Sequence, residues 1–469
     1  MGSMQLEPAA LELDRTLLDL YQEDNEDGNV PDLALLIPSG TTSLSAGIPA
    51  STKYAYQAPR APNLPLDIMA RVCMTTGPSY MSFVAGNMKL NFFNPDKHKN
   101  EPKGDAEYRI HQLDVTANFN QLPEHQRPEI DFVYSPDEID CEEGQKVAFL
   151  TPLDCFSEVP SLIDLDTHYE LLSKRELAVA GLPTPRSDLI DCELSVEDIE
   201  DDGRIDQEVN RMMSYVVDAV PPFVVKLPQA LAGQGVYVVA NAEEQREAIQ
   251  NVLPEVKKMI QAINQDNQHL HTACLIIQDM IPGTAVALSF FITKKGRAIF
   301  TGCCEQDIDS KGAWAGALIN YEQQKELEEK YAETMQQIAS HVFSRGYWGP
   351  MGADVMTDLD GKQLVIDLNV RVAGSYVLGF LKNHLSVSKG LDYAALLYPL
   401  PLKGTRADFD KLFKQELADG KLLVVGWCHG RAGPWGIIKY SIASVVAAAE
   451  SPEELRVLSD KVNARRIRK

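Results

Sequence analysis

The chain has 469 residues, of which 45% are hydrophobic and 24% are charged, and its formal net charge at pH 7 is -23. This composition is typical of a soluble globular protein, and the length allows about three domains. The acidic balance argues against a nucleic-acid or anionic-membrane surface, because both favour patches of lysine and arginine. No apolar run approaches the roughly 20 residues that a membrane-spanning helix needs, and no signal peptide opens the chain, so we expect a cytoplasmic location.

The eight cysteines show neither C-x-x-C spacing nor a regular framework. Most of them stand among apolar neighbours, so we expect reduced thiols in the core of an intracellular protein. Cys303 and Cys304 are adjacent, and a redox role for this pair is the alternative to simple packing.

The first third of the chain is expected to form a small α/β domain, residues 1–165. Its apolar runs predict a helix over residues 8–21 and short strands over 32–38, 131–134 and 147–150. We expect a domain boundary close to residue 165.

A helix is expected at residues 169–179, because leucines form an apolar stripe there and Gly181 is placed to end it. The acidic stretch 187–210 is expected to be mostly solvated surface. Next come a strand over 222–226 that ends in Lys226, a glycine-bearing loop, and a strand over 236–240. Backbone N–H groups near Gly233 and Gly235 could face a polyphosphate beside Lys226, although an ordinary hairpin is the default interpretation.

The next segment, residues 241–344, is expected to form further strands and two helices. A capping box at residues 241–244 opens the first helix, and strands are expected over 274–280, 285–293 and 298–304. Residues 302–321 leave a strand, and the expected loop there is either a lid over substrate or plain surface. An amphipathic helix is predicted over 322–344. The charged and aromatic residues of the expected loop are Glu305, Asp307, Lys311 and Trp314.

Residues 352–375 contain a hairpin pattern that carries two facing acids. Asp360-Gly361 is a two-residue turn signal, and counting outward from it places Asp354 opposite Asp367. Like charges at opposed positions destabilise a strand pair, so these carboxylates call for a cation, and their oxygens suit Mg²⁺. A solvated edge with chance acids is the alternative. The expected polar face carries Asp367, Asn369 and Arg371, and the expected core face carries Ala353, Val355, Leu364, Ile366, Leu368 and Val370.

The remaining residues are expected to close the substrate end. A helix over 377–385 carries Lys382 and His384, which could meet a substrate carboxylate or lie on a solvated helix face. From residue 401 onward we expect a C-terminal cap with a strand at 422–427, a loop at 426–440 and a helix at 452–467. His429 and Arg431 in that loop are candidate substrate contacts.

Four motifs follow one another along the chain: the AGLPTP helix, the strand–Lys–glycine loop–strand unit, the IIQDMIPG strand and the acid hairpin ending in D-L-N-x-R. In this order they resemble the ATP-grasp superfamily of carboxylate–amine ligases. The resemblance covers roughly residues 166–400. Within that superfamily the chain looks most like the fungal ATP-grasp proteins described as solid-state-culture specific. The resemblance implies an α/β (α+β) ATP-grasp domain at 166–400, between an N-terminal pre-ATP-grasp domain at 1–165 and a C-terminal cap at 401–469.

The resemblance also implies the roles of individual residues. Lys226 matches the lysine that contacts the nucleotide phosphates, and Arg371 matches the basic residue that stabilises the γ-phosphate and an acyl-phosphate; both are implied catalytic residues. The other implied positions are the closing loop at Gly233, Gln234 and Gly235, the adenine hinge at Gln278, Asp279 and Ile281, and the metal ligands Asp354, Asp367 and Asn369.

Several positions depart from the family pattern. Glu170 stands where a second phosphate-binding lysine is common, and Lys174 follows one turn later, as either a substitute or a surface lysine. Gln278 replaces a common hinge glutamate, and Thr284 and Ala285 stand where an acid would contact the ribose. Asp367 replaces a commoner glutamate.

The implied activity is ligation of a carboxylate, such as an amino acid, to an amine, with release of ADP and phosphate. ATP and Mg²⁺, with Mn²⁺ as an alternative ion, are the implied cofactors. The alternatives are a small-molecule kinase that uses the same site, and a nucleotide-binding module without catalysis. Small molecules are the expected partners, without nucleic acid or membrane, and a homodimer is compatible with the sequence.

Overall fold

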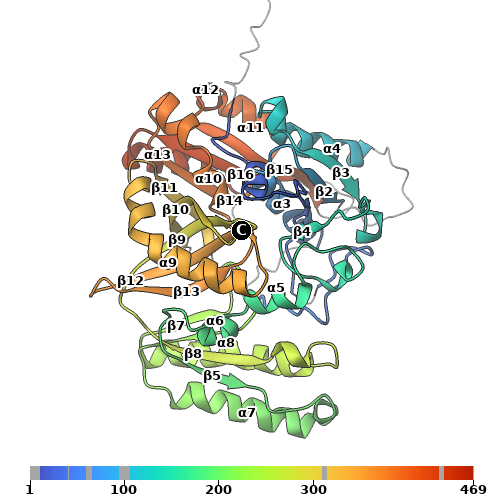
Figure 1. The fold of residues 1–469 in the computed structure, drawn as a ribbon, viewed down its shortest axis with the longest axis vertical. Coiled ribbons are helices and arrows are strands. Elements are labelled where there is room, and N and C mark those ends of the chain that lie inside the picture. Colours follow the sequence, from blue (N-terminus) through green and yellow to red (C-terminus); the bar gives the residue numbers. More distant parts are fainter. Residues whose placement is uncertain are drawn as a thin grey trace, which may run out of the picture.

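The computed structural model describes residues 11–40, 42–59, 66–94, 106–308, 314–432 and 438–467. Strands in these residues form a four-stranded parallel sheet, a four-stranded antiparallel sheet and an eight-stranded sheet. Figure 1 shows the small antiparallel sheet with its helices at one end of the molecule, and the other two sheets together at the opposite end.

The N-terminal parallel sheet has the order β3-β2-β1-β4. Strands over parts of 32–38, 131–134 and 147–150 were predicted, whereas β2 was not. The predicted helix over 8–21 is wrong in its first half, because α1 starts only after Thr16, whose side chain forms a capping box with Asp19; residues 1–10 lie outside the described part. The elements are β1 (Asp32–Ala34), β2 (Lys89–Phe93), β3 (Glu129–Val133), β4 (Val147–Phe149), α1 (Leu17–Gln22), α2 (Leu66–Arg71), α3 (Gly77–Ser82) and α4 (Ala106–Phe119).

The small antiparallel sheet has the order β5-β8-β6-β7, and α7 and α8 cover one of its faces. The expectation of mostly solvated surface at 187–210 is confirmed, since only Ile190, Ile205, Glu208 and Val209 are buried there, although the stretch also contains β5 and the start of α7. Apolar residues of α7 recur at helical spacing and are buried, and Glu208 is buried with them, whereas Asp202, Asp206 and Asp218 are exposed. The elements are β5 (Ser187–Asp191), β6 (Phe223–Lys226), β7 (Val236–Val239), β8 (Cys274–Asp279), α7 (Asp202–Asp218) and α8 (Ala242–Gln261).

The single helix predicted at 169–179 is instead two short helices, α5 (Leu165–Leu171) and α6 (Lys174–Val179). The helix is interrupted at Ser173, whose side chain accepts a hydrogen bond from the Arg175 N–H at 3.2 Å and so caps the second helix. This second start changes the direction in which the first residue of α6 points.

The large sheet has the order β13-β12-β9-β10-β11-β14-β16-β15, with antiparallel neighbours throughout. On one face α9 packs against β9 and β12, and α11 and α13 pack against β14 and β16. The N-terminal part of the chain packs against the other face. The elements are β9 (Gly283–Ile292), β10 (Ala298–Ile308), β11 (Trp314–Asn320), β12 (Gly349–Asp358), β13 (Gln363–Asn369), β14 (Tyr393–Lys403), β15 (Leu422–Ala432), β16 (Ile438–Ala449), α9 (Gln324–Ser344), α11 (Arg406–Leu412), α12 (Lys414–Ala418) and α13 (Pro452–Asn463).

Two predicted loops are strands of this sheet. Glu305 and Asp307 belong to β10 and Trp314 begins β11, while Lys311 lies outside the described residues. His429 and Arg431 belong to β15, although the Arg431 side chain is outside the described part. The helix expected at 377–385 is replaced by α10 (Tyr376–Gly379) and a π-helical turn over Asn383–Val387.

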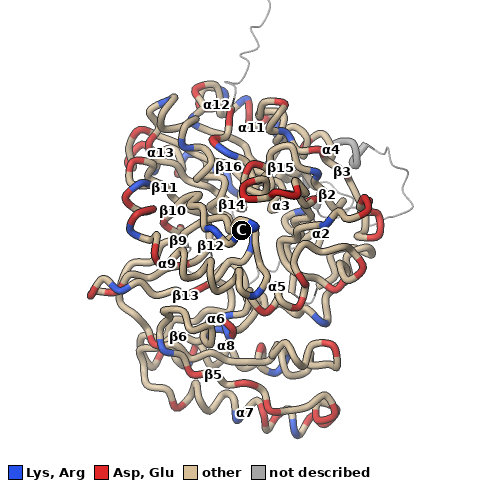
Figure 2. Tube along the Cα trace, viewed as in Figure 1, with Lys and Arg blue, Asp and Glu red and all other residues tan. Residues whose placement is uncertain are grey.

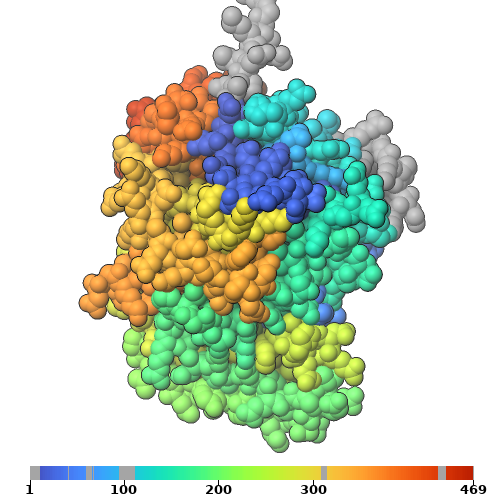
Figure 3. All heavy atoms as spheres, in the orientation of Figure 1, coloured from blue at the N-terminus to red at the C-terminus, as the bar shows by residue number. Residues whose placement is uncertain are grey.

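The C-terminal strands belong to the same sheet as the acid hairpin, and residue 400 lies inside β14. Figure 3 shows the N-terminal segment, in blue, seated against the yellow and orange strands and helices of this large sheet. The eight cysteines are all free, as predicted. Within the described ranges, none of the helices combines the length and apolarity needed to cross a membrane.

Candidate active site

The acid hairpin β12–β13 has the predicted pairing of Asp354 with Asp367, although it reaches this register by a different route. The turn is longer than predicted, because Thr357 pairs with Gln363 rather than with Leu364. A bulge at Ile366 then adds one residue to β13 and restores the expected register.

The bulge also changes which side chains reach the core. Val365, which pairs with Val355, is fully buried in the core beneath α9, whereas Ile366 is only half-buried. The prediction of Ile366 in the core is therefore wrong. Leu364 is buried as predicted, but it pairs with Met356 and does not share the face of Val355. The placement of Ala353, Val355, Leu368 and Val370 is confirmed.

The two facing carboxyl groups interact electrostatically. Burial, together with the negative charge of Asp367, raises the pKa of Asp354 to about 7. Lys174, Lys226 and a hydrogen bond from Gln306 act in the opposite direction. A buried acid beside a second acid favours a cation, so this end of the sheet is built to attract positive charge.

Lys226 reaches this site from the small sheet. Its side chain is buried, and its Nζ donates a hydrogen bond of 2.7 Å to the carbonyl oxygen of Ile366, the bulged residue. Burial lowers the pKa of Lys226 to about 8, and the charges of Asp367 and Asp354 limit that fall. Lys226, which was predicted to contact phosphate, therefore links the small sheet to the large sheet beside Asp354 and Asp367.

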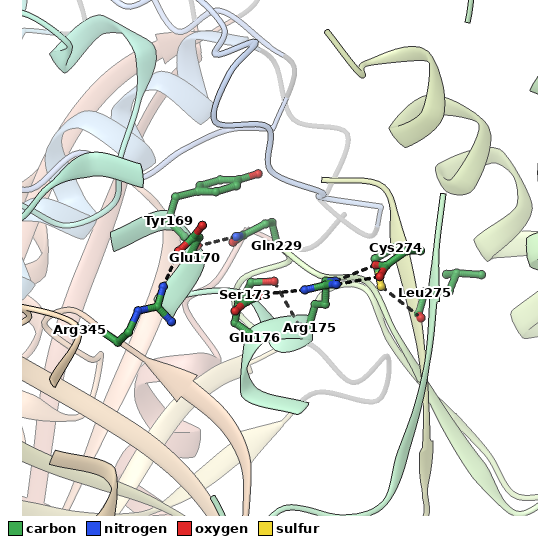
Figure 4. A network of polar contacts seen from close by, with 10 residues as sticks. Tyr169, Glu170, Ser173, Arg175, Glu176, Gln229, Cys274, Leu275 and Arg345 are labelled. Atoms are coloured by element: carbon green, nitrogen blue, oxygen red, sulfur yellow. Dashed lines mark hydrogen bonds and ion pairs between the residues drawn. The ribbon is translucent and has the colours of Figure 1, made fainter. Parts of the chain in front are cut away.

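Lys174 also lies at the site. Its side chain is only 5% exposed, its Nζ lies 3.2 Å from Asp367 Oδ1, and it donates a hydrogen bond of 2.7 Å to the carbonyl oxygen of Ala230. Glu170, which occupies the expected lysine position, instead pairs with Arg345, as Figure 4 shows. Of the two alternatives left open by the sequence, the surface-lysine interpretation is wrong.

The glycine loop connects β6 and β7 above these lysines. Ala232, Gly233 and Gly235 all have positive φ angles, which bend the chain back on itself. At Gly235 a side chain would also collide with its surroundings, since a Cβ there would lie 2.6 Å from the Cβ of Ala230. The loop is held at its base by the N–H of Leu227, which donates to the Gly235 carbonyl at 2.8 Å.

Gln278 lies on the same face of the small sheet as Lys226. β-Pairing places Lys226 opposite Ile276 and Val224 opposite Gln278, and paired residues share a face. The Gln278 side chain is buried and donates to Ser187 Oγ at 3.0 Å, whereas Asp279 is exposed and Ile281 is half-buried. The hinge predicted from the sequence therefore borders the face that carries the phosphate-binding candidate.

Arg371 and Asn369 extend the site beyond the acids. The Arg371 guanidinium donates to Asn369 Oδ1 at 2.7 Å, which fixes the amide that follows Asp367 on the strand. Burial lowers the pKa of Arg371, and the charge of Asp367 opposes this change. The Arg371 guanidinium, the Asn369 amide and the two facing carboxyl groups thus form one connected polar group.

Gln306 is a residue of the site that the sequence interpretation missed. It lies in β10 and its side chain donates a hydrogen bond to Asp354. The flanking acids Glu305 and Asp307 instead line a hollow of about 590 Å³ beside α9 and α13. Recognition of residues 298–308 as one long strand would have shown that Gln306 faces away from those two acids.

Other candidate residues lie elsewhere. His384 lines a hollow with Glu12 and Asp14, and the charge of Lys382 acts on Asp14. His429 lies near His111 and Asp114 of α4. Across the rest of the surface, Figure 2 shows acidic residues spread over the outer sides of α7, α9 and α13, in line with the net charge of -23.

Comparison with known proteins supports the assignment of the fold. Residues 204–369 match the family model of the ATP-grasp domain of L-aspartate–L-methionine ligase. This segment includes the glycine loop, Lys226, the hinge strand and the acid hairpin. An ATP-grasp domain is therefore shown for residues 204–369.

The solved structures that resemble this chain are distant. An L-amino acid ligase from Bacillus licheniformis shares 12% identity, with a TM-score of 0.46 over 94% of this chain and 99% of its own. A phosphoribosylamine–glycine ligase from Thermotoga maritima shares 12% identity, with a TM-score of 0.45 over 92% and 96% of the two chains. A search of curated protein sequences gave no match.

Proposed function

We propose that the protein is an ATP-dependent ligase that joins a carboxylate to an amine through an acyl-phosphate and releases ADP and phosphate. The observation that carries the proposal is the convergence of two buried lysines, Lys174 and Lys226, on the acid pair Asp354 and Asp367. Lysines suit phosphate oxygens, and acids suit a divalent ion that accompanies a nucleoside triphosphate.

The residues present fit a magnesium ion. Asp354 and Asp367 offer carboxylate oxygens and Asn369 offers an amide, which are the ligand types that Mg²⁺ prefers. The raised pKa of Asp354 reflects burial and the negative charge of the neighbouring Asp367, a situation that a bound cation relieves. When bound, the ion neutralises charge on the phosphate oxygens.

The chemical problem is that a carboxylate is a poor acyl donor. In the proposed reaction a carboxylate oxygen attacks the γ-phosphorus of ATP and ADP leaves; the amine nitrogen then attacks the acyl carbon, phosphate leaves, and the nitrogen loses a proton. Lys174 and Lys226 would hold the phosphates, and Arg371 would stabilise charge on the γ-phosphate and the acyl-phosphate. The glycine loop would exclude water, which would otherwise hydrolyse the intermediate.

The remaining assignments follow the fold. Gln278, Asp279 and Ile281 would hold the adenine, and Gly233, Gln234 and Gly235 would close over the phosphates. Backbone N–H groups near Gly374 and Ser375, or Arg371 itself, would meet the oxyanion of the second step. We propose residues 166–400 as the unit that binds nucleotide, with residues 1–165 and 401–469 forming the walls that select the substrates.

We propose amino acids or related small acids as the acyl donor. The matched family model describes a ligase of two amino acids, and the narrower resemblance to the fungal solid-state-culture proteins rests on the overall character of the sequence alone. Both substrates would be small molecules.

The test is phosphate and ADP release over a panel of amino acids and amines with ATP and Mg²⁺, followed by mass spectrometry of the products. Ligation predicts ADP release that depends on the amine and a product with a new amide bond. A stable phosphorylated acid would instead show a kinase, and nucleotide binding without turnover would show a binding module.

The variants Asp354→Asn and Asp367→Asn test the acid pair itself. Each is expected to abolish Mg²⁺-dependent turnover while circular dichroism stays unchanged, because asparagine keeps the size and removes the charge. Near-normal activity in both variants would exclude this metal site.

A further inference from the structure

Trp314, the first residue of β11, contacts two parts of the site that come from different regions of the chain. Its backbone N–H donates to the carbonyl oxygen of Ala232, in the glycine loop, at 3.3 Å. Its indole ring packs on Gly374, three residues after Arg371. The residue therefore touches both the phosphate loop and the turn that follows the basic residue of the site.

The contact with Gly374 is close enough to define the residue at that position. A Cβ on Gly374 would lie 2.6 Å from Trp314 Cη2 and 2.8 Å from Cζ2, and it would lie 3.3 Å from the Tyr80 hydroxyl. Real Cβ atoms do not approach ring carbons so closely. The turn after Arg371 is thus shaped around the indole.

The indole is also part of an aromatic group that reaches Arg371. Its ring centroid lies 6.0 Å from that of Tyr398, and the Tyr398 and Tyr80 centroids are 4.6 Å apart. Tyr80 lies close enough to Arg371 for the two groups to influence each other's pKa. Displacement of the indole would therefore disturb the surroundings of Arg371 as well as the backbone at Gly374.

The same β10–β11 pair reaches the metal end of the site. Gln306 in β10 donates to Asp354, and Trp314 pairs with Ile308 across the two strands. One strand pair consequently contacts the acid pair, the glycine loop and the turn after Arg371.

We propose that Trp314 is a positioning residue that couples the glycine loop to the Arg371 turn, so that nucleotide binding also orders the side of the site that receives the carboxylate. This inference rests on the proposed function. The loop carbonyl and the turn contact opposite ends of one rigid residue, so fixing the loop fixes the position of the indole, and the indole limits the positions open to residues 373–376.

A merely structural role for Trp314 makes a different prediction. A tryptophan that only fills space would lower the stability of the fold when truncated, and nucleotide binding would leave the exchange of residues 373–376 unchanged. Amide hydrogen exchange separates the two, because it reports each segment on its own.

The experiment measures hydrogen exchange in the full chain with and without Mg²⁺ and the non-hydrolysable nucleotide AMP-PNP. In the wild type we expect the nucleotide to slow exchange both at residues 231–235 and at residues 373–376, the latter by about tenfold, since coupling between sites usually corresponds to about 5- to 150-fold. In Trp314→Ala the loop should remain protected while the effect at 373–376 is lost, and Trp314→Phe should restore part of it.

Trp348→Phe is the matched control, because Trp348 is also half-buried but packs edge-on against Tyr21. It should keep the full response at 373–376. Gly374→Ala provides a second route to the same contact, since its methyl group would displace the indole. Its effect should be much smaller in the Trp314→Ala background, where the methyl group meets no ring.

The outcomes separate the two proposals. If the wild type binds no nucleotide, the proposed function fails. If it binds nucleotide and protects residues 231–235, yet residues 373–376 do not respond or respond equally in Trp314→Ala, the coupling role of Trp314 is overturned while the proposed function stands. Additive effects of Gly374→Ala and Trp314→Ala would also count against the coupling.

Discussion

Lys226 donates its hydrogen bond to the backbone oxygen of Ile366, the residue whose bulge interrupts the pairing of the acid hairpin. In a regular strand pair this carbonyl would be directed toward the neighbouring strand. The bulge leaves it unpaired within the sheet and available to the lysine, so an irregularity in one sheet holds a charged residue of the other beside the acid pair.

Lys226→Met tests the importance of this cation. The variant keeps the length of the side chain but loses its charge and donor, and we expect turnover to fall by about 10²- to 10³-fold, as when one stabilising donor is removed from an active site. ADP release is the measurement, and Lys325→Met, on the exposed side of α9, is the control. Folded Lys226→Met protein with wild-type turnover would contradict the assignment.

Lys174→Met and Glu170→Gln together test which residue serves the phosphates. Lys174 contacts Asp367, whereas Glu170 pairs with Arg345. We expect Lys174→Met to weaken binding of MgADP by about tenfold or more, equivalent to about 1.4 kcal/mol. Isothermal titration calorimetry should show Glu170→Gln within about twofold of the wild type, since exposed ion pairs contribute at most about 1 kcal/mol to stability. A larger effect of Glu170→Gln would reverse the assignment.

Gly235→Ala compared with Gly28→Ala tests the close packing of the glycine loop. Both glycines have almost the same positive φ, +67° and +68°, so the backbone strain of an alanine should be alike. Only at Gly235 would the new Cβ meet a neighbour, the Ala230 Cβ at 2.6 Å, whereas Gly28 has open space.

We expect Gly235→Ala to lower the free energy of unfolding by about 1–3 kcal/mol more than Gly28→Ala does. Urea unfolding of the two variants measures this difference. Equal losses would mean that the loop adjusts without strain, and its close packing would then have no energetic consequence.

His168 gives the fold a dependence on pH. The imidazole is buried, Nε2 lies 2.7 Å from the Val370 carbonyl oxygen, and burial lowers the pKa of His168 to about 4. The unfolded chain therefore binds the proton between pH 6.5 and 4 while the folded chain does not. Stability contributed by the neutral imidazole is present above pH 6.5 and is lost as the pH falls toward 4, by roughly 3 kcal/mol.

Thermal unfolding of the wild type and of His168→Gln over pH 4–7 checks this expectation. The variant should be less stable at pH 7 but lose less stability on acidification, because glutamine does not titrate. Parallel curves for the two proteins would show that other groups cause the acid sensitivity.

The sequence predicted the core of the site because local rules dominate there. The pairing of Asp354 with Asp367 came from a turn signal and strand alternation, and Lys226 came from its place at the end of a buried strand. The agreement was partly fortuitous, since the longer turn and the bulge at Ile366 shift the register in opposite directions. No local pattern reveals such a bulge, because its partner, Lys226, is distant in sequence.

Other parts depend on tertiary contacts that a single sequence does not display. The position of Lys174 is set by the interruption of the helix at Ser173, and the role of Gln306 is set by the length of β10. The stretch 187–210 appears polar because α7 buries only one stripe, so its acids outnumber its core residues. In each case the missing information was which face a residue turns toward.

The continuity of the large sheet has a consequence for truncated forms of the protein. β11 is paired on its outer side only by β14, and β14 is paired in turn by β16. A fragment that ended before Tyr393 would leave the backbone groups of β11 without partners, and such a bare edge recruits strands from other molecules. Removal of residues 393–469, about a sixth of the chain, would therefore leave a fragment prone to aggregate, rather than a smaller folded protein.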